Sequence, residues 1–164
     1  MIHSSELPNE EAKRLQLLAR LLPIKDRKAL KEEIEFSIRL KEFGYQILKV
    51  HYEISDSKTK HFFSDVDVLA LSPKGEIHWF ELKNSLGFFN HKKPKIQIKR
   101  RRQLRRLQKM ACDKVSPLGV IDKVFFATLE PISPEGLLYL RTEYPEVLPF
   151  AAKGDFFGPI SQTL

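Results

Sequence analysis

The sequence predicts an α/β fold in which helices flank a mixed β-sheet. Two helix-like stretches open the chain, three strand-like runs separated by turns follow, and a basic helix then precedes a short apolar run typical of a buried strand. This order, α-α-β-β-β-α-β-α, is that of a layered α/β sandwich. The 164 residues, 42% of them hydrophobic, can bury one core of ordinary size, so we expect a single domain over residues 1–164.

Two helices are expected before the first strand. Residues 9–22 are predicted to form a helix because Asn9 can cap its N-terminus and Pro23 ends it. A second helix is expected from about residue 26 to residue 43. Gly44 would end this helix, since glycine most readily takes the left-handed conformation that follows many helix C-termini.

Three strands are expected next, at residues 45–54, 61–71 and 76–83. The residues Ser72-Pro73-Lys74-Gly75 are a strong turn signal between the second and third strands. Because this turn is short, we expect it to bring the two strands together as antiparallel neighbours.

The second half of the chain predicts a helix, a strand and a further short helix. The basic helix is expected from about residue 95 to residue 111, and a buried strand from 123 to 129. Ser133 and Pro134 place a capping residue before a proline at the first helical position, which predicts a short helix to about residue 141. The rest of the C-terminal extension, residues 130–164, shows little periodicity.

The positive charge is concentrated in one segment. The formal charge is +7, and residues 92–109 hold ten of the 28 lysines and arginines and no acid, which leaves 18 basic residues against 21 acidic ones elsewhere. This pattern favours a helix that binds a polyanion, and the alternative is a solvated basic face. The residues expected to contact nucleic acid are Lys95, Lys99, Arg100, Arg101, Arg102, Arg105 and Arg106.

Charged residues also interrupt the second and third predicted strands. Asp65 and Asp67 lie in the segment DVDVLAL, and Glu81 and Lys83 lie in HWFELK. Antiparallel pairing outward from the turn would place Asp67 near Glu81, and two like charges at one position destabilise a sheet. The charges therefore indicate either the wet face of an edge hairpin or a site that holds a cation.

A magnesium ion would satisfy these carboxylates. Hard divalent cations bind one or two carboxylates, with water and substrate phosphate completing the coordination sphere. Lys83 could then orient or help deprotonate a water molecule, or stabilise the pentavalent phosphate. With the basic helix nearby, this chemistry describes phosphodiester hydrolysis with Mg²⁺, for which Mn²⁺ is an expected substitute.

The spacing of Asp67 and Glu81-Leu82-Lys83 on two strands joined by a turn resembles the active-site signature of the PD-(D/E)XK, or restriction-endonuclease-like, nuclease superfamily. The first motif reads Ser64-Asp65-Val66-Asp67 where the family name gives Pro-Asp, so Asp65 is a further candidate. The resemblance implies an α-β-β-β-α-β core at about residues 26–129, with the helix at 9–22 and the segment 130–164 outside it.

The preceding helix extends this resemblance. Glu33, eleven residues before Gly44, is similar to the glutamate that joins the active site in archaeal Holliday-junction resolvases. The family also places a glutamine on the helix after the Glu-x-Lys strand, which implies Gln103 in preference to Gln97. The resemblance therefore implies Glu33, Asp67, Glu81, Lys83 and Gln103 as catalytic residues, Asp67, Glu81 and Glu33 as metal ligands, DNA as substrate and a homodimer.

Two other functions fit parts of the sequence. A non-catalytic nucleic-acid-binding module could keep the same fold, and an assembly protein could bind RNA through its basic helix; neither explains the intact Asp, Glu and Lys set. The lone Cys112 excludes an internal disulfide. With no expected membrane segment, signal peptide or small-molecule cofactor, we expect a cytoplasmic protein. Phe88 and Phe89 could stack on an unpaired base or anchor a loop.

Overall fold

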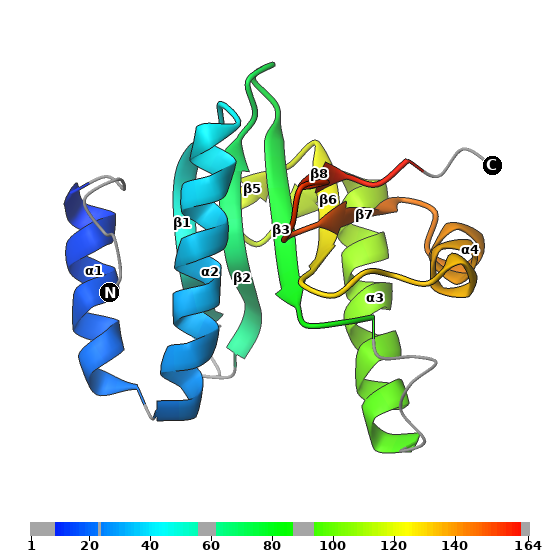
Figure 1. Ribbon diagram of the computed structural model, residues 1–164, viewed down its shortest axis with the longest axis horizontal. Coiled ribbons are helices and arrows are strands. Elements are labelled where there is room, and N and C mark those ends of the chain that lie inside the picture. The colour runs from blue at the N-terminus through cyan, green and yellow to red at the C-terminus, as the bar shows by residue number, and fades with distance from the viewer. Residues whose placement is uncertain (1–8, 23, 56–61, 87–93, 162–164) are drawn as a thin grey trace. The chain divides into compact units, whose positions relative to one another are not determined.

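The computed structural model describes residues 9–22, 24–55, 62–86 and 94–161 (Figure 1). The elements are α1 (Asn9–Leu21), α2 (Ile24–Glu42), β1 (Gln46–Ser55), β2 (Phe62–Leu71), β3 (Ile77–Lys83), α3 (Pro94–Asp113), β4 (Val115–Ser116), β5 (Gly119–Val120), β6 (Lys123–Thr128), α4 (Pro134–Glu143), β7 (Val147–Ala151) and β8 (Gly158–Pro159). Every predicted element is present, with its ends within about two residues of the prediction.

The fold is α/β, as predicted, with a mixed six-stranded sheet in the order β1-β2-β3-β6-β7-β8. Strands β1 and β2 pair antiparallel, and β6 and β7 pair parallel. The chain divides into two compact units, Met1–Trp79 and Phe80–Leu164, and the boundary falls inside β3. The expectation of one nuclease-like domain stays a prediction, and the two units are described in turn.

In the first unit, α1 and α2 both contact β1, and they are the blue and cyan helices beside that strand in Figure 1. The side of α2 that is buried carries Leu30, Ile34 and Leu40. Gly44 ends this helix with φ +93°, and the amide of Tyr45 donates to the carbonyl of Leu40 at 3.1 Å. This is the left-handed helix end that the sequence predicts.

In the second unit, α3 packs on β6 and β7, and α4 packs on β7. Leu104 and Leu107 are the fully buried leucines of α3. A chain of aromatic contacts with centroid distances of 5.1 to 5.4 Å also lies in the core of this unit. Its members are Phe80, Phe125, Phe150 and Phe157.

The C-terminal extension contributes more to the sheet than its weak periodicity indicates. Residues of β7 pair with β6 from Val124↔Val147 to Thr128↔Ala151, and β8 then pairs with β7. Strand β7 was not predicted because Pro149 interrupts its apolar run, and a proline within such a run makes a strand less expected there. The other elements absent from the prediction, β4, β5 and β8, are two residues each, too short to show an alternating pattern.

Candidate active site

In the first unit, two of the predicted carboxylates, Glu33 and Asp67, lie near His51. Glu33 lies on the buried side of α2 with 6% of its surface exposed, and its Oε2 accepts a hydrogen bond from Nδ1 of His51 at 2.7 Å. That hydrogen bond raises the pKa of His51 above 6.5 against the opposing effect of burial, and the negative charges of Glu33, Asp67 and Glu53 raise it further. Glu33 and Asp67 are therefore both within electrostatic reach of one imidazole.

His51 reaches this position through an unusual backbone conformation. It sits inside β1 with φ +48°, a left-handed conformation uncommon for residues other than glycine. In the β1–β2 ladder, Val50 pairs with Val68 and Tyr52 pairs with Val66, so the position across from His51 belongs to Asp67.

A pair of charged side chains on α1 fixes this part of β1. Glu11, 7% exposed, accepts from the amide of Val50 at 2.8 Å. Arg14 pairs with Glu11 at 2.7 Å and donates to the carbonyl oxygens of Val50 and His51, the latter at 3.2 Å. We call Glu11 and Arg14 the α1 clip. The helix that lies outside the expected core thus holds the backbone that carries His51.

The two aspartates of β2 have different surroundings. Asp67 is half-buried, between the buried residues Val66 and Val68, whereas Asp65 is exposed. Strand alternation puts both aspartates on the face opposite to the two valines. Of the two, Asp67 therefore has the environment expected of an active-site carboxylate, and Asp65 has that of a surface residue.

In the second unit, the Glu-x-Lys motif lies at the end of β3. Glu81 is 4% exposed, and Lys83, two residues on and on the same face, is half-buried. The Lys83 Nζ lies 3.6 Å from Oε1 of Glu81, and Nη2 of Arg106 lies 3.9 Å from Oε2. A buried carboxylate remains charged only where cations compensate it, and here both cations come from residues singled out in the sequence.

Two further predicted residues lie on α3 close to this motif. Oε1 of Gln103 accepts from Nη1 of Arg100 at 2.8 Å, and the Arg100 guanidinium lies 5.5 Å from the centre of the Phe126 ring. Burial lowers the pKa of Arg100 from its ordinary value, and the negative charge of Glu81 acts in the opposite direction. Gln103 thus holds an arginine that is coupled to Glu81.

The other predicted nucleic-acid contacts on the basic helix are exposed. They are Lys95, Lys99, Arg101, Arg102 and Arg105. Gln97, the alternative to Gln103, is half-buried and lies two turns earlier on the helix. The residues Phe88 and Phe89, considered for base stacking, lie outside the described part of the chain.

A metal site can be compared with the predicted ligands. In residues 9–22, 24–55, 62–86 and 94–161, no group of three or more His, Cys, Asp or Glu side chains could hold a metal ion. The predicted ligands Glu33 and Asp67 belong to the first unit and Glu81 to the second. Their carboxylate oxygens are the donors that Mg²⁺ prefers, and Mg²⁺ takes most of its remaining ligands from water and phosphate. The chemistry of these donors therefore fits Mg²⁺.

Sequence reasoning missed His51 and the α1 clip. The histidines show no metal-ligand spacing in the sequence, so no motif singles out His51. The only signal that could have found it is its position opposite Asp67, which requires the β1–β2 register. Nothing in the spacing of Glu11 and Arg14 distinguishes them from an ordinary helix-surface ion pair.

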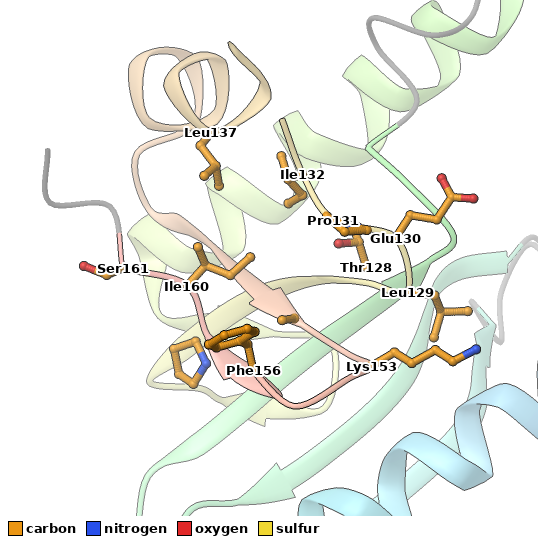
Figure 2. A pocket seen from close by; sticks show the side chains of 12 residues that line it. Thr128, Leu129, Glu130, Pro131, Ile132, Leu137, Lys153, Phe156, Ile160 and Ser161 are labelled. Atoms are coloured by element: carbon orange, nitrogen blue, oxygen red, sulfur yellow. The ribbon is translucent and has the colours of Figure 1, made fainter. Parts of the chain in front are cut away.

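A pocket of about 440 Å³ lies in the second unit near the C-terminal end of β6 (Figure 2). Its lining is mostly apolar, and Lys153 and Glu130 are its charged residues. Phe156, which Figure 2 shows close to Ile160, is 91% exposed. None of the predicted site residues lines this pocket.

Two comparisons with known proteins found no match. No model of a known protein family matches it, and no curated protein matches it. Among the described helices, none combines the length and the apolar composition needed to cross a membrane. Function is therefore inferred from the side chains described above.

Proposed function

We propose that the protein is a metal-dependent DNA endonuclease built on a restriction-endonuclease-like core. The observation that carries the proposal is the Glu81-Leu82-Lys83 motif, in which a carboxylate 4% exposed lies 3.6 Å from the Lys83 ammonium. Burying a carboxylate beside a lysine at the end of a strand costs desolvation energy, and a hairpin with a purely structural role does not require such a buried charge.

The turn before β3 is formed at the residues where the sequence predicts it. The amide of Ser72 donates to the carbonyl of Glu76 at 2.7 Å, and the amide of Gly75 donates to Ser72 at 2.9 Å. In the sequence, Asp67 lies five residues before Ser72 and Glu81 five residues after Glu76. We infer from this equal spacing about the turn that the two carboxylates act together.

Asp67 and Glu81 would hold Mg²⁺, with Glu33 as a further carboxylate and Mn²⁺ as a substitute ion. When bound, such an ion lowers the pKa of a coordinated water and neutralises charge on the phosphate. Lys83 orients the attacking water through its ammonium group, and Gln103 holds Arg100 in place. His51 fixes the orientation of the Glu33 carboxylate by donating to it.

The reaction is hydrolysis of a phosphodiester. The water oxygen forms a bond to phosphorus, and the bond from phosphorus to one sugar oxygen breaks, leaving its electron pair on that oxygen. The water supplies two protons in total: one ends on the departing sugar oxygen, and the other is released or stays on the phosphate. One product therefore ends in a phosphomonoester and the other in a hydroxyl group.

The exposed cations of α3 support DNA as the proposed substrate. The five predicted contacts that are exposed on this helix suit the phosphate backbone of DNA and would make binding fall steeply with salt. We further propose a structure-specific substrate such as a four-way junction, a homodimer that brings one active site to each of two strands, and a location inside the cell.

Cleavage of a panel of labelled DNAs tests this function. The panel contains a four-way junction, nicked and linear duplexes, a flap and a single strand, each incubated with Mg²⁺ or with EDTA. We expect cutting only with Mg²⁺, and the preferred DNA would define the substrate. Tight, salt-sensitive binding without cutting in Mg²⁺ or Mn²⁺ would instead favour a non-catalytic nucleic-acid-binding module.

The neighbouring aspartates provide a matched pair of variants for this assay. Asp67→Asn is expected to lower the cleavage rate at least about 100-fold, because it removes a metal-binding charge. Asp65→Asn makes the same chemical change at an exposed position two residues away and is expected to cut within about threefold of the wild type. Equal rates for the two variants would contradict the role given to Asp67.

A further inference from the structure

Two arginines of α3 differ from the other cations of that helix. Arg100 and Arg106 are half-buried, whereas the other five predicted nucleic-acid contacts on α3 are exposed. Both are coupled to the same carboxylate: Arg106 lies 3.9 Å from Glu81, and the charge of Glu81 acts on the pKa of Arg100. Lys83 and Arg106 therefore lie beside one buried carboxylate, and the charge of that carboxylate also acts on Arg100.

These two arginines have buried N–H groups without acceptors. Within the described part of the chain, Nε of Arg100 and Nε of Arg106 are both buried and have no hydrogen-bond partner. The contact from Arg106 to Glu81, at 3.9 Å, is an ion pair but is too long for a hydrogen bond. A buried donor left unsatisfied costs about 1–3 kcal/mol, and native structures rarely leave one without a reason.

The charge of this cluster is also unbalanced. Within the second unit, Lys83 and Arg106 lie within 4 Å of Glu81 and the charge of Glu81 acts on Arg100, so these four side chains together carry two formal positive charges in excess. Excess charge in a partly buried position is unfavourable without a counter-ion. The open hydrogen bonds and the excess charge both call for an anion with several acceptor oxygens.

We propose that Arg100, Arg106 and Lys83 form a binding site for a phosphate group of the nucleic-acid backbone, next to Glu81. We take this phosphate to be the one that is cut, and that part of the proposal rests on the proposed function. A phosphodiester offers two unesterified oxygens, and arginine forks bind such oxygens with directed, charge-assisted hydrogen bonds. A metal cation would not satisfy these groups, because guanidinium has donors and no acceptor.

The surroundings of Arg100 prepare it for this role. Its guanidinium is held from one side by Oε1 of Gln103 at 2.8 Å and lies 5.5 Å from the centre of the Phe126 ring. These contacts restrict the side chain before any ligand binds, which lowers the entropy lost on binding. The basic helix therefore has two functions: its exposed cations attract the backbone, and Arg100 and Arg106 position one phosphate.

The arginine Nε–H resonances of the wild-type protein test this site directly. Because both Nε groups are buried, their protons should give observable signals in a nitrogen–proton correlation spectrum, assigned with Arg100→Lys and Arg106→Lys. The spectrum is recorded in EDTA while a short single-stranded oligonucleotide or inorganic phosphate is added. We expect both signals to shift when the oligonucleotide is added. If inorganic phosphate, added by itself, also shifts them, the site binds free phosphate in addition to the nucleic-acid backbone. Signals unchanged at saturating oligonucleotide would overturn the proposal.

Variants provide a second measurement. Arg106→Gln is expected to slow cleavage about 100-fold at saturating DNA, as the loss of one charge-stabilising donor does elsewhere. Arg102→Gln, at an exposed position on the same helix, should instead weaken DNA binding. It should also reduce the slope of log affinity against log salt concentration by about 1. Arg20→Gln on α1 is the control for the chemical change, and the melting temperature of each variant checks that it is folded. Cleavage by Arg106→Gln at the wild-type rate would count against the site.

The two proposals fail in distinguishable ways. If the Nε signals shift with the oligonucleotide but no DNA is cut, the phosphate site stands and the nuclease proposal fails. If DNA is cut while the signals stay fixed and Arg106→Gln cuts normally, the nuclease proposal stands and the phosphate site fails.

Discussion

Replacing Arg14 by alanine should destabilise the protein strongly, although Arg14 lies on a surface helix. Arg14 bonds the carbonyl oxygens of Val50 and His51 and neutralises Glu11, whose side chain is 8% exposed. In Arg14→Ala these two carbonyl groups lose a charged donor, and Glu11 stays buried beside the amide of Val50 without its cation. The residue at φ +48°, His51, also loses the contact that holds its carbonyl.

The magnitude follows from these contacts. A hydrogen bond to a charged group contributes about 1.5–3 kcal/mol, and removing one partner of a buried ion pair costs about 3–5 kcal/mol. The Arg14 side chain is 29% exposed, so water can replace part of what is lost. We expect Arg14→Ala to lower the free energy of unfolding by about 2–4 kcal/mol. Glu11→Gln should lower it by less, about 1–2 kcal/mol, because an amide oxygen can still accept from Val50.

Urea denaturation of the wild type, both single variants and the double variant measures this effect. The double variant should be more stable than the sum of the single losses predicts, by about 1–2 kcal/mol, because the two residues act through one contact. Arg20→Ala, on the exposed side of the same helix, should change stability by less than about 0.5 kcal/mol. If Arg14→Ala is as stable as Arg20→Ala, with unchanged dependence on urea, the α1 clip does not hold β1.

Two further predictions concern residues near this strand. The pKa of His51 in the metal-free protein should lie above 6.5, because Glu33 accepts its hydrogen bond; the resulting stabilisation is fully present below pH 6.5 and is lost as pH rises through the folded-state pKa. Imidazole chemical shifts measured in EDTA against pH check this, and His51→Asn should flatten the pH dependence of stability over that window. Gly44→Ala should destabilise by about 1–2 kcal/mol, since φ is +93° and an added Cβ would lie 3.0 Å from Pro73. Gly154→Ala, at φ +91° with open space around it, is the control in a melting experiment, and equal losses would show that contact with Pro73 adds nothing.

Much of the fold was predictable because its elements carry strong local signals. The turn predicted at residues 72–75 is present, with the amide of Gly75 donating to the carbonyl of Ser72 at 2.9 Å. The helix end at Gly44 follows from one residue type and its conformational freedom. Strand β7 escaped prediction because Pro149 lies within it.

The arrangement around the site was harder to predict because it depends on contacts between distant segments. His51 approaches Glu33 only because its backbone is left-handed, and that conformation is held by residues far earlier in the chain. The basic helix carries cations around its circumference, so composition alone could not separate the half-buried Arg106 from the exposed Arg105. The partner that separates them is Glu81, on another element.

The most direct test of the central claim is the cleavage rate of Glu81→Gln compared with the wild type, on the preferred DNA in Mg²⁺. The substitution keeps the shape of the side chain and removes the charge that Lys83 and Arg106 compensate. We predict a loss of at least about 1,000-fold while salt-sensitive DNA binding is retained, since the exposed cations of α3 are untouched. Cleavage by Glu81→Gln at the wild-type rate would contradict the assignment of this motif as the active site.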